Sequence, residues 1–169
     1  MIYVCPLSRL HETVEQSGAR HIVTLINADT PVERPPQVPA DNHLFVGVND
    51  IIEPMDGMTA PAETHVGEVI EFVRGWDRSA PIVIHCWAGI SRSTAAAYLT
   101  ACLFAPHRDE MALARRLRAA SPSATPNRRI VDIADRLLGR DGRMSDAIAR
   151  IGRGRAAFEG DVFALSIDE

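Results

Sequence analysis

One short stretch of the sequence has residue types and a spacing that suit chemistry on an anion. It reads His85-Cys86-Trp87-Ala88-Gly89-Ile90-Ser91-Arg92-Ser93, and lies between an apolar segment and an alanine-rich one. A loop between a buried strand and a helix binds anions, because its backbone N–H groups and the positive end of the helix dipole converge on one point. We therefore expect residues 87–92 to form a phosphate-binding loop.

Cys86 and Arg92 are the reactive pair of this stretch. A helix N-terminus and a nearby cation favour the thiolate of a cysteine, so Cys86 is predicted to be a nucleophile. The planar guanidinium of Arg92 can hold two phosphoryl oxygens at once, which a lysine cannot do. Gly89 lets the loop close where a Cβ would obstruct it. The alternative is that Cys86 is a buried residue ending a strand and Arg92 a surface residue starting a helix.

Two neighbours of this pair are predicted to assist it. The hydroxyl of Ser93 can donate a hydrogen bond to the sulfur of Cys86 when that sulfur becomes the leaving group. His85 is expected to orient the nucleophile rather than act as a base, because a thiolate needs no base to ionise it.

A His-Cys pair, five further residues, an arginine and a serine together resemble the signature of the protein tyrosine and dual-specificity phosphatase superfamily. The chain looks like a small, bacterial-type member. The resemblance covers about residues 2–139 and implies hydrolysis of phosphate monoesters through a phosphocysteine intermediate. It implies no cofactor and no metal, with a phosphate- or sulfate-type anion bound in the loop.

The same resemblance implies a general acid on a separate loop, an aspartate that follows the preceding strand. Asp50, in the segment VGVNDIIEP, fits this place, although Glu53 and Asp56 lie on the same loop and Asp50 could simply form a turn. Pro126-Asn127 resembles a pair that braces the phosphate loop in such enzymes. Capping of the following helix would also explain Asn127.

The expected substrate is protein phosphotyrosine, with phosphoserine, phosphothreonine and small phosphomonoesters as further candidates. A chain this short resembles the dual-specificity branch, whose pocket is shallow. The variable loop positions carry no basic residue, which disfavours polyphosphorylated inositol lipids. Two alternatives stay open: a rhodanese-type sulfurtransferase, which His85 and Arg92-Ser93 disfavour, and a catalytically silent module that recognises phosphate, which would lack the acid.

Alternating strands and helices must position these residues. Strands are predicted at 2–7, 21–27, 43–49 and 81–86, and helices at 8–18, 63–76, 93–104, 109–120 and 127–138. The pattern indicates a three-layer α/β sandwich, similar to dual-specificity phosphatases, with a mostly parallel sheet of four to five strands flanked by helices. Residues 1–139 are predicted to be the catalytic domain. Residues 140–169, with one helix at 144–151, are expected to be a loosely attached extension of unknown role.

Composition excludes some classes of partner and indicates where the protein is located. A net charge of −4 argues against nucleic acid or an anionic membrane as a partner. With no apolar run of about 20 residues and no signal-like N-terminus, a cytoplasmic protein is expected. An odd number of three cysteines suggests neither a disulfide framework nor a zinc site. Cys5 and Cys102 are therefore expected to pack in the core. Whether Cys5 has a redox role is left open by the sequence. All 18 basic residues are arginines, and the dense run over 108–155 is expected to be a solvated face.

Overall fold

The computed structural model describes residues 1–167, in which one five-stranded sheet has the order β3-β2-β4-β1-β5. The strands are β1 (Ile2–Pro6), β2 (His21–Ile26), β3 (His43–Gly47), β4 (Ile82–Cys86) and β5 (Phe163–Leu165). Strands β1 to β4 are all parallel to one another, and β5 pairs with β1 in the antiparallel sense. The predicted mostly parallel sheet is confirmed.

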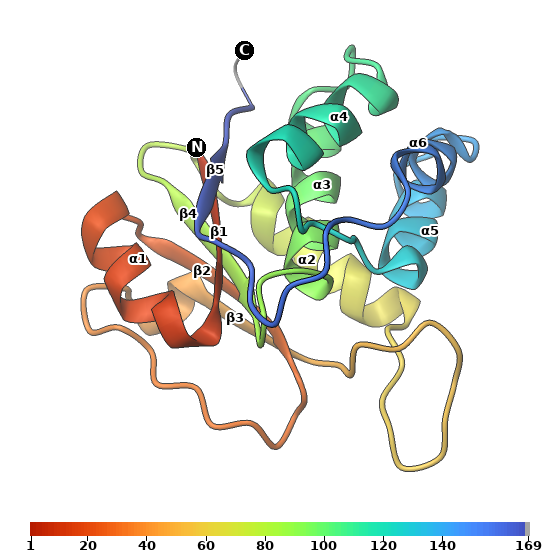
Figure 1. Cartoon of the computed structure of the whole chain (residues 1–169). Coiled ribbons are helices and arrows are strands. Elements are labelled where there is room, and N and C mark those ends of the chain that lie inside the picture. The colour runs from red at the N-terminus through yellow and green to blue at the C-terminus, as the bar shows by residue number, and fades with distance from the viewer. Residues whose placement is uncertain (168–169) are drawn as a thin grey trace.

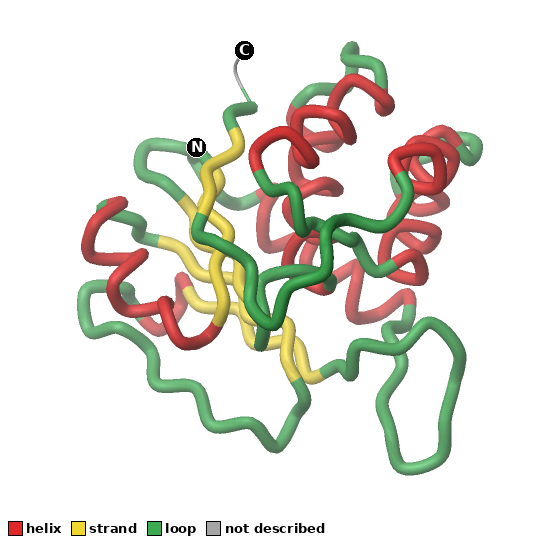
Figure 2. Tube along the Cα trace, in the orientation of Figure 1, coloured by secondary structure: helices red, strands yellow, loops and turns green. Residues whose placement is uncertain are grey.

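Helices cover both faces of this sheet. They are α1 (Leu10–Ser17), α2 (Glu63–Arg74), α3 (Arg92–Phe104), α4 (Glu110–Ala120), α5 (Arg128–Leu137) and α6 (Arg143–Ile151). Figure 1 shows α1 on one side of the sheet and the other helices on the opposite side. Figure 2 shows the same division into helical and strand layers, so the predicted three-layer α/β sandwich is confirmed.

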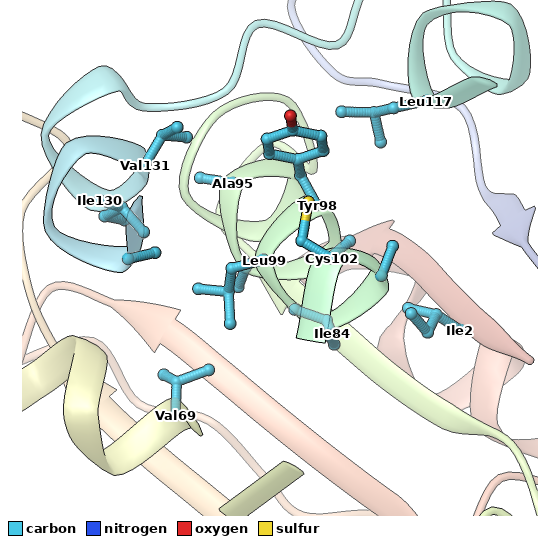
Figure 3. Close-up of a cluster of buried hydrophobic side chains, with 14 of the residues drawn as sticks. Ile2, Val69, Ile84, Ala95, Tyr98, Leu99, Cys102, Leu117, Ile130 and Val131 are labelled. Atoms are coloured by element: carbon cyan, nitrogen blue, oxygen red, sulfur yellow. The ribbon is translucent and has the colours of Figure 1, made fainter. Parts of the chain in front are cut away.

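The sequence of β4 and α3 explains why these two elements lie at the centre. All five residues of β4 are buried, as expected for a strand with neighbours on both sides and helices over both faces. The small side chains of α3 let it pack closely, and every residue from Arg92 to Cys102 is buried. Figure 3 shows Tyr98, Leu99 and Cys102 of α3 within the main core. The strand and the helix on either side of the predicted phosphate loop are therefore both buried in the core.

The C-terminal segment differs from the loosely attached extension that the sequence suggested. Met144, Ala147 and Ile148 of α6 are buried, and α6 packs against α4 and α5. Phe163 and Leu165 of β5 are also buried and belong to the main core. The segment thus completes one edge of the sheet and closes the hydrophobic core.

The arginine-rich stretch is only partly a solvated face. Arg140 is 7% exposed, and its Nη1 donates to Oε1 of the buried Glu110 at 2.9 Å. Arg118 is partly buried and donates to three backbone carbonyls, those of Ala124, Ile151 and Gly152. These two guanidiniums hold α4 to the C-terminal segment, because each replaces water with polar groups of another element.

Within residues 1–167, every helix is too short or too polar to cross a lipid bilayer.

Candidate active site

The predicted phosphate loop lies at the carboxyl end of β4, between Cys86 and the first residue of α3. Gly89 has φ of 70°, a conformation that side chains disfavour. A Cβ on Gly89 would lie 2.7 Å from the backbone nitrogen of Pro6, at the end of β1. The loop therefore closes tightly against β1 only because this position is glycine. The backbone N–H of Leu7 donates to the carbonyl of Trp87 at 3.1 Å and ties the two segments together.

The sulfur of Cys86 lies at the floor of this loop, within hydrogen-bonding distance of Gly89 in the loop and of Ser93 in α3. The backbone N–H of Gly89 points at Sγ from 3.3 Å, and the hydroxyl oxygen of Ser93 lies 3.1 Å from Sγ. Cys86 is 2% exposed. These contacts surround Sγ with groups that can donate hydrogen bonds to it, at the N-terminus of α3.

Arg92 reaches the same site from the first turn of α3. Its Nη1 donates to Oδ1 of Asn27 at 2.8 Å and to the carbonyl of Val48 at 2.9 Å, which fixes the guanidinium. Its Nε is buried and has no hydrogen-bond partner among residues 1–167. A buried donor without a partner is costly, so the guanidinium keeps a free donor for a bound anion. Asn27 was not predicted from the sequence; its place directly after β2 was the signal available.

A cavity of about 470 Å³ opens beside this guanidinium and is called the loop pocket here. It is lined by residues from the ends of β2 and β3 and from the phosphate loop: Ile26, Asn27, Thr30, Asn49, Asp50, Ile51, Met58, Trp87 and Arg92. Trp87 is 53% exposed, so it stands at the rim of this pocket rather than beneath the loop.

Asp50 lies at the edge of the loop pocket, on the segment that follows β3. Its Oδ1 accepts hydrogen bonds from the hydroxyl of Ser91 at 2.7 Å and from Nδ2 of Asn127 at 2.8 Å. Glu53 and Asp56 are exposed, and within the described residues neither is hydrogen-bonded to the phosphate loop. Of the three candidate acids, Asp50 is the one that the fold brings to the loop.

Asn127 fits both of the roles that the sequence left open. Its Oδ1 accepts from the backbone N–H of Ile130 at 3.1 Å, which caps α5. Its Nδ2 donates to Asp50, and its backbone N–H donates to the carbonyl of Ser91 at 3.2 Å. One residue thus begins α5 and connects it to the loop and to the candidate acid.

His85 lies behind the loop, in a chain of hydrogen bonds whose direction is set by a carbonyl group. Its Nδ1 lies 3.3 Å from the carbonyl oxygen of Cys86, which can only accept, so Nδ1 carries the proton. Its Nε2 then accepts from the hydroxyl of Thr24 at 2.7 Å, and Thr24 accepts from Nε2 of His43 at 2.8 Å. Burial lowers the pKa of His85 to about 4. A neutral ring with both nitrogens engaged suits a positioning role.

The other two cysteines pack in the interior, as their sequence context suggested. Cys5 and Cys102 are buried and free of disulfides. Burial raises the pKa of each thiol to about 12, although hydrogen bonds with Thr13 and Tyr98 respectively act in the opposite direction. Both thiols therefore stay protonated near neutral pH. Trp76 is 2% exposed and also lies in the core.

A family model described as "Tc-R-P: Polymorphic toxin system, DSP-PTPase phosphatase" matches residues 5–104, more than half of the chain. That span runs from β1 to the end of α3 and includes Asp50, Cys86 and Arg92. No curated protein matches the chain.

Several solved structures share the fold at low sequence identity. The PTP-2 phosphatase of Cydia pomonella has a TM-score of 0.61 at 20% identity, over 79% of this chain and 83% of its own. A mouse putative dual specificity phosphatase complexed with zinc tungstate has a TM-score of 0.62 at 17% identity, over 87% of this chain and 86% of its own. The human tyrosine phosphatase-like serine/threonine/tyrosine-interacting protein has a TM-score of 0.62 at 17% identity, over 83% of this chain and 92% of its own. With the family match, the loop signature and this fold, the chain belongs to the DSP-PTPase phosphatase family and is a cysteine phosphatase of the protein tyrosine and dual-specificity superfamily.

Proposed function

We propose that the chain hydrolyses phosphate monoesters in two displacements, with Cys86 as the nucleophile. The observation that carries this proposal is the convergence on one sulfur of the Gly89 N–H and the Ser93 hydroxyl, with Arg92 held beside the same loop. Donors gathered in this way stabilise a thiolate and, next to it, the oxygens of a phosphoryl group.

In the first displacement the sulfur lone pair of Cys86 attacks phosphorus, and the bond from phosphorus to the ester oxygen breaks. The loop amides and the guanidinium of Arg92 hold the equatorial oxygens, whose charge is spread in the transition state. Asp50 gives its proton to the departing alcohol or phenol. Ser91 and Asn127 support this role, because they hold Oδ1 of Asp50, while Oδ2 has no hydrogen bond to any other residue in 1–167.

In the second displacement water attacks the phosphocysteine. Asp50, now a carboxylate, takes a proton from the water, and the bond from sulfur to phosphorus breaks. The electron pair returns to Cys86 as a thiolate, which Ser93 stabilises through its hydroxyl at 3.1 Å. Phosphate leaves, and Asp50 has its proton again for the next cycle.

The proposed substrate is a protein phosphotyrosine, with phosphoserine and phosphothreonine as slower substrates. The loop pocket supports this choice, because Trp87 and Met58 at its lining are exposed apolar side chains on which a phenyl ring can pack.

We further propose that the catalytic domain extends beyond residue 139 to β5. Three free cysteines suit a reducing compartment, which supports the cytoplasm as the location.

An aryl phosphate assay with chelator present tests the proposed function. We expect the wild-type chain to release phosphate and Cys86→Ser to release none while still binding tungstate, a tetrahedral oxyanion, as seen by a thermal shift. Cys102→Ala is the matched control, because this thiol is buried away from the loop on α3 and its loss should leave turnover intact. Undiminished turnover in Cys86→Ser would refute the mechanism, and conversion of thiosulfate and cyanide to thiocyanate would favour the sulfurtransferase.

A further inference from the structure

A second cavity, of about 520 Å³, adjoins the loop pocket on the other side of Asp50. We call it the arginine groove, because Arg128, Arg153 and Arg155 line it together with Asp50 and Ser91. Asp50 belongs to the lining of both cavities. A substrate whose ester oxygen meets Asp50 therefore has the rest of its structure within reach of this groove.

The arginines of the groove are not held in ion pairs among residues 1–167, although Arg128 also lines a neighbouring cavity that contains Glu53, Glu63 and Asp132. Arg128, Arg153 and Arg155 are exposed, and within residues 1–167 none of them forms an ion pair. Asp50 is the acidic residue of the lining, and its Oδ1 is already engaged by Ser91 and Asn127. Three guanidiniums around one hollow repel one another unless an anion lies among them. Each also has a planar set of donors that matches a carboxylate or a phosphate.

The outer wall of the groove is fixed to the rest of the fold. Arg118 donates to the carbonyls of Ile151 and Gly152, at 2.9 and 2.6 Å. Beyond this point the backbone N–H of Gly154 donates to the hydroxyl of Thr125 at 3.0 Å, and that of Arg155 donates to the carbonyl of Pro122 at 2.8 Å. The side chains of Arg153 and Arg155 therefore extend from an anchored backbone, which lowers the entropy lost on binding.

The same segment then reaches the phosphate loop itself. The backbone N–H of Gly160 donates to the carbonyl of Ala88 at 2.8 Å, and Oε2 of Glu159 accepts from the hydroxyl of Ser8 at 3.0 Å. In Figure 1 this dark blue segment passes in front of the loop that joins β4 to α3. The C-terminal segment thus forms part of the surroundings of the loop.

We propose that the arginine groove binds a second anionic group of the substrate, an acidic or phosphorylated side chain next to the phosphoresidue of a peptide. The proposal rests on the proposed phosphatase function and specifies its substrate class. The variable positions of the loop carry no basic residue, so selectivity for a highly charged peptide must come from outside the loop. The groove supplies that charge from α5 and from the segment after α6.

The test compares two phosphotyrosine peptides of equal length, one with neutral flanks and one with glutamate or phosphoserine flanks. We expect kcat/KM of the wild-type chain to be about tenfold higher for the acidic peptide, as two or three partly exposed charge pairs would give. The triple variant Arg128→Gln/Arg153→Gln/Arg155→Gln should bring this ratio close to one. The preference should also weaken as salt is added.

A control variant separates the groove from the overall charge. Arg108→Gln/Arg115→Gln/Arg150→Gln removes three exposed arginines that lie outside the groove lining, and it should keep the tenfold ratio. A wild-type ratio near one, or an unchanged ratio in the groove variant, would overturn the proposal.

Binding separates failure of this proposal from failure of the proposed function. Fluorescence anisotropy with Cys86→Ser and the same labelled peptides measures recognition without turnover. Tighter binding of the acidic peptide that disappears in the groove variant supports the groove even if neither peptide is hydrolysed. Equal binding of both peptides contradicts the groove even if both are hydrolysed.

Discussion

Replacing Ser93 with alanine separates the two displacements proposed for Cys86. The hydroxyl of Ser93 lies 3.1 Å from Sγ and can donate a hydrogen bond to the thiolate. In the first displacement the sulfur loses its charge as it bonds to phosphorus, so losing this hydrogen bond should not slow the step. In the second displacement the thiolate forms again, and the missing donor then raises the barrier.

A hydrogen bond to a charged group contributes about 1.5–3 kcal/mol, and each 1.4 kcal/mol is a factor of ten in rate. Ser93→Ala should therefore slow hydrolysis of the phosphocysteine by about 10- to 150-fold. Stopped-flow release of nitrophenol from an aryl phosphate should show a burst close to one equivalent per enzyme, followed by a slow steady rate.

The control for this experiment is a buried hydroxyl elsewhere on α3. Thr100 donates to the carbonyl of Ala96 at 2.7 Å, and Thr100→Val removes this hydroxyl with little change of shape. It should lower the melting temperature without producing a burst. An unchanged kcat in Ser93→Ala, or a slower first step with no burst, would refute the role given to Ser93.

Two other changes test the frame around the sulfur. Gly89→Ala would place a Cβ 2.7 Å from the nitrogen of Pro6, at φ of 70°, so we expect turnover and the thermal shift by tungstate to be lost together; retention of both would contradict the tight closure of the loop. The pKa of about 4 for His85 lies below 6.5, so only the unfolded state binds this proton between those values, and stability should fall by up to about 3 kcal/mol as pH drops from 6.5 to 4. Urea unfolding should show this slope in the wild-type chain and a smaller one in His85→Gln; equal slopes would contradict it.

The elements around the loop could be predicted because their patterns are local. The apolar run Ile82–Cys86 and the alanine-rich segment after it indicate a buried strand and a closely packed helix, and the structure has both. β5 could not be predicted in the same way. Phe163–Leu165 is only three residues long, and it is a strand because β1 leaves an edge free far away in the sequence.

The site residues that are close in sequence could be predicted, whereas those on a distant strand could not. Cys86, Arg92 and Ser93 are close in sequence, so their spacing alone indicated a common site. Thr24 lies within β2 and Asn27 directly after it, and only the strand order brings them to His85 and Arg92 respectively.

The positions of the arginines in the fold could not be predicted from composition. The sequence shows a dense arginine run, but it does not distinguish those that are buried from those that line a cavity. Arg140 pairs with Glu110 in the interior, whereas Arg128 lines the arginine groove and forms no ion pair with any residue in 1–167. Whether an arginine is buried in an ion pair or exposed depends on which acidic groups lie near it once α4, α5 and α6 are packed together, and this is a property of the tertiary structure.

The most direct test of the central claim is to trap the enzyme during turnover and locate the phosphoryl group. Ser93→Ala is mixed with an aryl phosphate, quenched in denaturant within the burst phase, and mapped by mass spectrometry of its peptides. We expect one phosphoryl group on the peptide that contains Cys86, and none when Cys86→Ser is treated in the same way. A phosphoryl group on another residue, or steady turnover with an unmodified Cys86 throughout the burst, would contradict it.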